Sequence, residues 1–204
     1  MSRIAIIGGT GNVGQRIAVE AQSRGHQVTV VARKPSAAIP FGANFVAGDA
    51  VTGAAALGEK LKGHDVLVSA AKFASVTAAN VLEVARGAGI GRVLVVGGAG
   101  SLEIKPGLRL VDTPDFPEAY KSEAVPGARF LDDLRTVHDV DWTFLTPAAH
   151  FVPGLRTGKF RLGGDAFFTD DKGNSVISYE DYAIAMLDEI EKPANVRKRF
   201  SIAY

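Results

Sequence analysis

Two spacings of apolar residues alternate along the chain, and together they predict an α/β protein. Short runs rich in Val, Ile and Ala are typical of buried parallel strands, and stretches with an apolar residue every three or four positions are typical of helices. The predicted strands cover Arg3–Ile7, Val28–Ala32, Asn44–Ala47, Val66–Ala70, Arg92–Val96 and Asp141–Leu145. The predicted helices cover residues 13–24, 54–61, 77–88, 118–138 and 179–191. This alternation through short links favours a doubly wound parallel sheet with right-handed crossovers.

The pattern is less regular in the second half of the chain. Residues 102–117 are rich in proline and have few periodic positions, which predicts a long loop. Pro126 and Gly127 are expected to break or kink the helix that follows, near its start. Residues 159–162 and 166–169 have the pattern of a hairpin.

Composition and charge narrow the classes of function. The chain has 204 residues, of which 47% are hydrophobic and 22% charged, as in an ordinary globular domain. A net charge of +1 without a long basic stripe argues against a nucleic-acid surface. We interpret Arg197, Lys198 and Arg199 as the solvated start of a last strand. No apolar run approaches the roughly 20 residues of a membrane helix. The first residues lead directly into a strand, so we predict a cytoplasmic protein without membrane contact.

Cysteine and histidine usage restricts the chemistry further. The chain has no cysteine, which excludes disulfides, thiol catalysis and cysteine metal sites. His26, His64 and His138 fall near predicted turns and lack metal-like spacing with carboxylates. We therefore predict no metal site.

The first strand runs into a glycine cluster that has the spacing of a phosphate-binding loop. Gly8 would make the turn out of the strand, Gly11 would let the backbone approach a pyrophosphate, and Gly14 would let the helix lie close. The helix N-terminus would present unpaired N–H groups and a partial positive charge to the phosphates. The alternative is an ordinary strand-to-helix turn that binds nothing. The predicted phosphate-loop residues are Gly8, Gly9, Thr10, Gly11, Asn12, Val13 and Gly14.

Two cations directly after the second strand indicate the cofactor. In dinucleotide folds an acidic residue about 20 positions past the glycines binds the ribose of NAD, and an arginine accommodates the 2′-phosphate of NADP. Arg33 and Lys34 stand here and no carboxylate does, so we predict NADP, with NAD as the alternative. Arg33 would use its planar fork on the phosphate. Its other interpretation is a solvated arginine at a strand end.

The remaining strand ends supply the other candidate cofactor contacts, because ligands of open α/β sheets bind beyond the carboxyl ends of the strands. Asp49 is placed to meet the adenine edge through its side chain or the next amide, or else to serve as a turn or N-cap residue. Small residues after the fourth strand would allow close backbone approach or simply pack tightly. The glycines after the fifth strand would leave a bare backbone wall for a flat ring. The candidates are Asp49, Ala50, Ala70, Ala71, Lys72, Gly97, Gly98 and Pro147.

We therefore predict one domain, 1–204. Residues of about 1–150 would form the nucleotide-binding core. Residues of about 151–204 would complete the sheet and face the substrate.

Four segments together resemble the atypical short-chain dehydrogenases, and within them the NmrA-like and NADH-flavin reductase group. They are IAIIGGTGNVG at 4–14, VLVVGGAGSL at 93–102, DWTFLTP at 141–147 and DYA at 181–183. The resemblance implies a one-domain NAD(P)-binding Rossmann protein. It also implies either a reductase of flavins, quinones or related acceptors, or a regulator that senses the cofactor.

The chain departs from the chemistry that the wider superfamily implies, a YxxxK pair in which tyrosine exchanges the proton. Lys121 is the counterpart of the lysine, but the tyrosine position is then Pro117, and Tyr120 has the wrong offset. The serine expected after the fifth strand meets Gly97 and Gly98, with Ser101 the nearest hydroxyl. These departures disfavour a carbonyl–alcohol dehydrogenase.

Hydride transfer to a stacked flavin or quinone depends mainly on positioning, so a protonating side chain is helpful rather than required. The candidates for that minor role are Tyr120, Ser101 and His150, each of which also has a purely structural interpretation. We predict an NADPH-dependent oxidoreductase with a flat conjugated acceptor. A non-catalytic redox sensor is the alternative, and a sugar-nucleotide epimerase or dehydratase is disfavoured. The sequence names neither the acceptor nor the oligomeric state.

Overall fold

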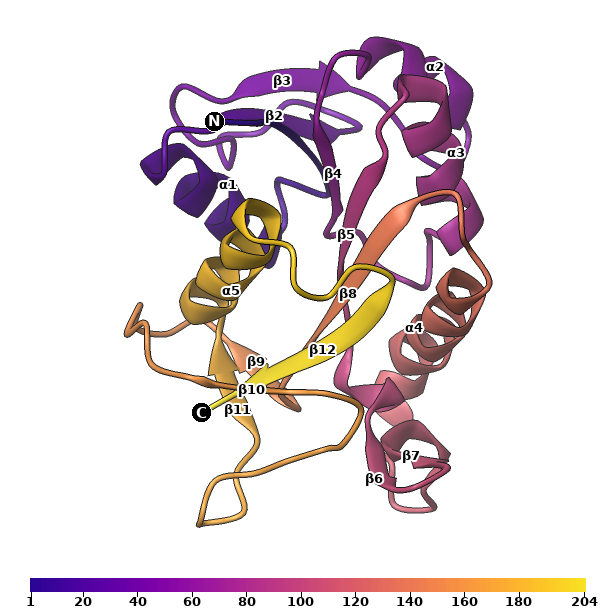
Figure 1. Cartoon of the computed structure of the whole chain (residues 1–204), viewed down its shortest axis with the longest axis vertical. Helices are drawn as coiled ribbons and strands as arrows, with labels where there is room; N and C mark the ends of the chain where they lie inside the picture. Colours follow the sequence, from indigo (N-terminus) through magenta and orange to yellow (C-terminus); the bar gives the residue numbers. More distant parts are fainter.

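The computed structural model describes residues 1–204 and contains one eight-stranded sheet at its centre (Figure 1). The strand order is β10-β12-β8-β5-β4-β1-β2-β3, and all neighbours are parallel except β10 against β12. The strands are β1 (Arg3–Ile7), β2 (Gln27–Ala32), β3 (Asn44–Ala47), β4 (Val66–Ser69), β5 (Arg92–Val96), β8 (Asp141–Pro147), β10 (Arg161–Gly163) and β12 (Lys198–Ala203). The predicted doubly wound parallel sheet is confirmed.

Helices cover both faces of this sheet. One face carries α1 (Asn12–Ser23) and α5 (Tyr179–Glu191), which lie side by side in Figure 1. The other carries α2 (Ala54–Lys60), α3 (Ala78–Ala88) and α4 (Glu118–Arg135). The strands β1, β2, β4, β5 and β8 contribute alternate residues to the two layers, as the pleat requires.

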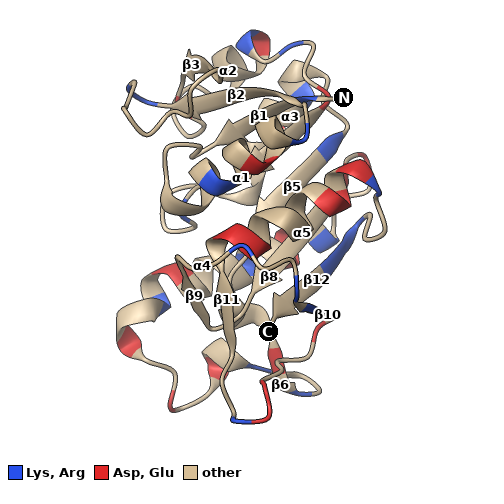
Figure 2. Ribbon diagram, turned by 90° about the vertical axis from the view of Figure 1, so that its left-hand side faces the viewer, with Lys and Arg blue, Asp and Glu red and all other residues tan.

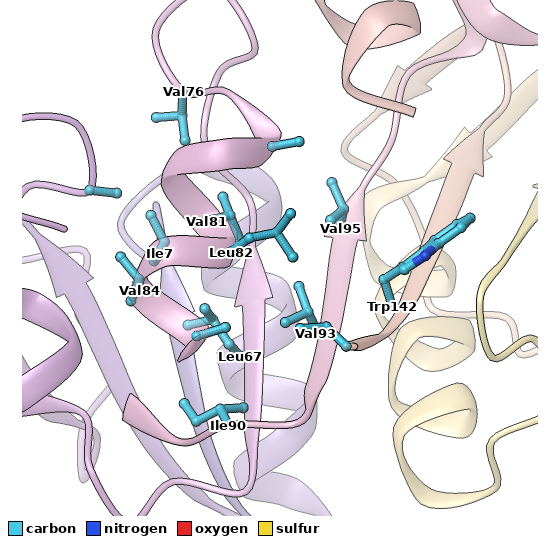
Figure 3. Packing of buried hydrophobic residues seen from close by; sticks show 14 of the residues in the cluster. Ile7, Leu67, Val76, Val81, Leu82, Val84, Ile90, Val93, Val95 and Trp142 are labelled. Carbon is cyan, nitrogen blue, oxygen red and sulfur yellow. The ribbon is translucent and has the colours of Figure 1, made fainter. Parts of the chain in front are cut away.

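The two apolar layers show this alternation in β1. Ile4 and Ile6 pack with α1 and α5, whereas Ala5 and Ile7 belong to the layer under α2, α3 and α4. Figure 3 shows the second layer, with Ile7 lying among residues from β4, α3 and β5. Burial of both strand faces explains why the strands are continuous apolar runs in the sequence.

Ion pairs join the two helices of the first face. Arg24, the C-cap of α1, lies 2.7 Å from Asp188 and 2.9 Å from Glu191 of α5, and Arg16 of α1 lies 3.1 Å from Glu180. Figure 2 views the molecule from this side and shows basic and acidic segments of α1 near acidic segments of α5. These contacts hold α5 beside α1.

The region between β5 and α4 differs from the predicted loop. It contains two short 3₁₀ helices (Ala99–Ser101 and Leu110–Asp112) and a hairpin of β6 (Glu103–Lys105) and β7 (Leu108–Arg109). The hairpin lies at the same end of the molecule as the start of α4 (Figure 1). Because the backbone groups of this segment pair locally, it has more structure than its proline content indicates.

The expected break in α4 is wrong, because the helix continues through Pro126. Gly127 has a packing role instead. A Cβ atom placed there would lie 2.8 Å from the ring of Phe73, so glycine lets that ring reach the helix. Phe73 packs edge-on against Phe130, with ring centroids 5.2 Å apart, and also contacts Phe144.

Two predictions in the last quarter are also wrong, and one strand pairing there was not predicted. The hairpin over 159–162 and 166–169 does not form, because β10 pairs with the distant β12. The residues that follow β8 form β9 (His150–Val152), which pairs in parallel with β11 (Val176–Ser178). Arg199 is 8% exposed rather than solvated, and its Nε donates to Asp165 Oδ1 at 2.7 Å. Long-range partners decide each of these positions.

Candidate functional site

The predicted cofactor residues follow the ends of different strands, and the fold brings these ends to one edge. Gly8 follows β1, Arg33 follows β2, Ala70 follows β4 and Gly97 follows β5. The strand order reverses between β1 and β4, because the chain builds β2 and β3 on one side of β1 and returns to build β4 on the other. Such a switch point opens the crevice where open α/β sheets bind ligands.

Gly8 lies at this switch point and fits only as glycine. Its φ of 76° is in the left-handed region, and its N–H donates to the Val31 carbonyl at 3.1 Å. A Cβ atom on Gly8 would lie 2.6 Å from the Ala70 carbonyl oxygen and 3.0 Å from the Ala71 nitrogen. The turn out of β1 therefore touches the backbone that leaves β4, and the small side chains at 70 and 71 accompany that close approach.

The start of α1 leaves backbone donors free. Gly11 is the N-cap and provides no side-chain cap, and the first turn contains no acidic residue. The N–H groups of Asn12, Val13 and Gly14 have no partner within the chain. With the positive end of the helix dipole, these donors form a cradle suited to an anion.

Gly14 and Gly9 fix the shape of this cradle. A Cβ atom on Gly14 would overlap the carbonyl oxygen of Gly8 and lie 2.8 Å from Cα of Gly9. A Cβ atom on Gly9 would lie 2.9 Å from the Val30 side chain. Thr10 contributes its carbonyl, which accepts from Gln15 Nε2 at 2.8 Å. The loop therefore folds back tightly on the helix it precedes.

Arg33 and Lys34 are exposed, and no ion pair or side-chain hydrogen bond engages them. Hydrogen bonds from the N–H groups of Val51 and Thr52 hold the pKa of the Asp49 carboxyl below its usual value, and the positive charge of Arg33 adds to this effect. Asp49 Oδ1 accepts from these amides at 2.7 and 3.3 Å. Asp49 is thus a turn residue, and the N-cap of α2 is Gly53.

The adjacent Ala50 is buried with α2 in the apolar layer. Its side chain therefore packs in the core. Only its backbone remains as the predicted contact with an adenine ring.

The loop after β4 is held from α4 by Glu123. The carboxylate of Glu123 accepts from the N–H groups of Phe73 at 2.5 Å and Ala74 at 3.1 Å. Lys72 lies between Phe73, whose N–H binds Glu123, and Ala71, whose backbone lies close to Gly8. The exposed Lys72 side chain has no partner. Glu123 was not predicted, because nothing in its local sequence distinguishes it from a solvated helix residue.

The two glycines after β5 have different roles. Gly97 is buried, and a Cβ atom there would overlap the Phe144 ring and lie 2.7 Å from the Leu145 carbonyl oxygen. Its part in a bare wall is therefore wrong, because close packing against β8 requires this glycine. Gly98 is half-buried, and a Cβ atom there would contact only the Phe73 ring, at 3.8 Å. Pro147 is the last residue of β8, and it is buried.

Among the proton-donor candidates, Ser101 is poorly placed. It is 4% exposed, its hydroxyl donates to the Gly98 carbonyl at 3.2 Å, and Arg199 Nη1 lies 3.5 Å away. Ser101 therefore supports the loop after β5 from within rather than facing a ligand. This corrects its assignment as a protonating group.

The other candidates remain accessible. Lys121 Nζ lies 2.7 Å from Glu118, in an ion pair on the surface of α4. Tyr120 is 66% exposed, and neither its hydroxyl nor the exposed His150 ring has a partner within the chain.

The DYA segment at 181–183 anchors the end of β8 and the segment after β9. The buried Tyr182 hydroxyl donates to the Leu145 carbonyl at 2.7 Å, and the Gly97 N–H donates to the same carbonyl at 2.8 Å. Burial raises the pKa of Tyr182 well above its usual value. Asp181 accepts from the N–H groups of Thr157 and Gly158 at 2.7 and 2.8 Å, which holds the segment after β9. The motif therefore has an anchoring role.

Two hollows on the surface of the molecule lie away from the strand-end edge. One of about 500 Å³ lies between α2 and α3, lined by residues such as Glu59 and Arg86. The other, of about 430 Å³, lies between α1 and α5 and is lined by Arg16, Glu20 and Arg156 among others. The candidate site lies at the strand ends instead, because the free N–H groups at the start of α1 are suited to bind an anion.

Two further observations concern metal ligands and membrane-spanning helices. The chain contains no group of three or more His, Cys, Asp or Glu side chains arranged to hold a metal ion. None of its helices combines the length and the apolar character needed to cross a membrane.

The sheet order, the switch point and the glycine cradle define a dinucleotide-binding Rossmann protein. A family model described as NAD(P)H-binding matches residues 8–193. The chain therefore belongs to the NAD(P)H-binding family, and the resemblance drawn from its sequence is confirmed at that level.

Several relatives match over nearly their full length. The "Uncharacterized protein YwnB" of Bacillus subtilis is 39% identical over 212 residues, covering 98% of this chain and 97% of its own. A crystal structure of a "Putative exported protein" from Burkholderia pseudomallei is 45% identical, covers 100% of both chains and has a TM-score of 0.89. A "putative NADH-flavin reductase" from Streptococcus pneumoniae is 36% identical, with a TM-score of 0.87 and coverage of 100% of this chain and 99% of its own.

Proposed function

We propose that this protein is an NADPH-dependent reductase that passes hydride to a flat conjugated acceptor of the flavin or quinone type. Membership of the NAD(P)H-binding family and similarity to the protein named as an NADH-flavin reductase support a nicotinamide-dependent oxidoreductase. The observation that carries the proposal is the cradle at the start of α1. Its free N–H groups, and the tight turn that only glycine at positions 8 and 14 allows, fit a pyrophosphate.

The residues of this chain would bind and orient the reactants. Asn12, Val13 and Gly14 would donate backbone hydrogen bonds to the pyrophosphate, and Arg33 would pair with the 2′-phosphate. The bound nicotinamide supplies two electrons and a proton as hydride, and water or an accessible side chain supplies the second proton that the reduced acceptor takes up. Gly98 leaves backbone exposed where a flat ring would lie.

The absence of the usual proton-relay pair favours this acceptor class. The tyrosine position is Pro117, which is the N-cap of α4, and Ser101 is buried. A carbonyl acceptor needs a positioned proton donor in the transition state. A stacked flavin or quinone depends instead on near-attack geometry, which the strand-end loops can provide.

Arg33→Ala is expected to weaken NADPH binding about tenfold and to leave NADH binding unchanged, because one exposed charge-assisted contact to the 2′-phosphate is lost. Calorimetric titration with both coenzymes measures this. Arg129→Ala is the charge-matched control, since Arg129 is an exposed arginine of α4 without an ion pair. Equal loss of both coenzymes, or no loss of either, would contradict the assignment of NADPH specificity to Arg33.

The activity itself is tested by mixing the protein anaerobically with NADPH and a panel of flavins and quinones. The expected result is acceptor-dependent loss of NADPH absorbance with saturation kinetics. If no member of the panel is reduced although NADPH binds, the reductase proposal is wrong.

A second candidate is a redox sensor that binds the coenzyme without turnover. The replacement of the tyrosine by Pro117 and the burial of Ser101 favour it, because both remove groups used in catalysis by the wider superfamily. Tight coenzyme binding, no turnover on any acceptor and a coenzyme-dependent protein partner would support the sensor.

A further inference from the structure

The apolar stripe of α4 continues beyond the part of the helix that the sheet covers. Gly127, Leu131 and Leu134 are buried members of this stripe. With 3.6 residues per turn, Tyr120 falls within about 20° of the direction of Gly127 and Leu131. Tyr120 nevertheless is 66% exposed. Tyr120 is therefore a large aromatic residue on the inward side of the helix, in the first turn of α4, where no other element covers it.

The neighbouring turn of α4 shows what Tyr120 lies above. Glu123 binds the N–H groups of Phe73 and Ala74 in the loop after β4. Ala124 packs against the loop after β5, since a Cβ atom on Gly100 would lie 2.9 Å from the Ala124 Cβ atom. Tyr120 is one helical turn further out than both contacts. Tyr120 is thus placed next to the loops after β4 and β5, which include the exposed backbone of Gly98 where a flat ring would lie.

We propose that the ring of Tyr120 forms one face of the acceptor site and stacks on the flat conjugated acceptor. This inference rests on the proposed function, because the acceptor would lie between the nicotinamide and Tyr120. Aromatic rings stack favourably on heteroaromatic ligands, and an exposed ring on an inward helix face gains such a partner without rearranging the core.

Tyr120 acts here through its ring rather than its hydroxyl. The residue four positions later, where a lysine would assist proton transfer, is Ala124. Lys121 points about 100° away around the helix and pairs with Glu118 at 2.7 Å. The phenol therefore lacks the cation that would activate it as an acid.

The test measures binding of FMN and of menadione to the NADPH-free and the NADP⁺-bound protein, by quenching of flavin fluorescence and by calorimetry. Tyr120→Ala is expected to weaken acceptor binding about tenfold, and Tyr120→Phe is expected to retain it. Affinity for NADP⁺ stays unchanged in both variants. Val125→Ala is the matched control, because Val125 is a 53% exposed apolar residue on the outward side of the same helix.

The outcomes separate this inference from the proposed function. Acceptor binding that depends on the Tyr120 ring, without any NADPH oxidation, would support the stacking site and overturn the reductase. Oxidation of NADPH with unchanged acceptor binding and KM in Tyr120→Ala would overturn the stacking site alone. Equal loss in Tyr120→Phe and Tyr120→Ala, or failure of the wild-type protein to bind either acceptor, would also overturn it. A pH–rate profile unchanged in Tyr120→Phe supports the ring over the hydroxyl.

Discussion

Replacement of Gly14 by alanine is expected to weaken coenzyme binding about 100-fold or more, because the added methyl group has no room. It would overlap the carbonyl oxygen of Gly8 and lie 2.8 Å from Cα of Gly9. Both are backbone atoms, so no side-chain rotation relieves the overlap. The start of α1 must move away from the loop and would carry the free N–H groups of Asn12, Val13 and Gly14 with it.

The measurement is calorimetric titration of Gly14→Ala with NADPH, together with circular dichroism to show that the fold is retained. Gly91→Ala is the matched control, because a Cβ atom at Gly91 meets nothing within 4 Å and its φ is not in the left-handed region. We expect the control to bind like the wild type. A folded Gly14→Ala protein with wild-type affinity would show that the coenzyme does not use this cradle.

The nucleotide-binding half could be predicted closely because its signals are local. The turn at Gly8, the stop of α3 at Gly89 and the apolar runs of the strands each depend on neighbouring residues. The capping box at Thr77, which accepts from the N–H of Asn80, is also local. Where the chemistry of a few adjacent residues decides the backbone, the sequence alone predicts it.

The errors fall where a distant partner decides. Phe144 requires glycine at position 97, Phe73 requires glycine at position 127, and the buried Ser101 hydroxyl lies 3.5 Å from Arg199 Nη1 of β12. The residues next to each of these positions in the sequence do not indicate the contact. The pairing of β10 with β12 is a similar case, because Arg161–Gly163 is equally suited to a local hairpin. The candidate site could thus be located from sequence, whereas the distinction between packing and exposed residues at its edge required the structure.

One buried ion pair shows how strongly such a distant contact can act. Glu189 of α5 is 4% exposed and accepts from Arg92 Nη2 at 2.9 Å, at the start of β5. It also accepts from the N–H of Asn195 at 2.9 Å. Burial lowers the pKa of Arg92, although Glu189 opposes that shift and the guanidinium stays charged. The pair therefore joins α5 and the turn before β12 to the sheet.

Glu189→Leu is expected to lower the free energy of unfolding by about 3–5 kcal/mol, because it leaves the Arg92 charge buried without a partner. Urea unfolding followed through Trp142, the single tryptophan and 2% exposed, measures this loss. The contrasting control is Asp139→Ala, which breaks the Arg86–Asp139 pair whose side chains are 51% and 60% exposed. That change should cost about 0–1 kcal/mol, since water screens the pair.

The double variant Arg92→Leu with Glu189→Leu distinguishes two causes of the lost stability, the unpaired Arg92 charge and the missing hydrogen bonds of Glu189. If the cost of Glu189→Leu comes from the unpaired charge, removal of that charge should restore a large part of the stability. If it comes from the hydrogen bonds of Glu189 to the turn at Asn195, the double variant should be as unstable as the single one. We expect partial recovery, because Arg92 Nη1 also binds Thr143 and the Asp141 carbonyl, and these contacts are lost with it.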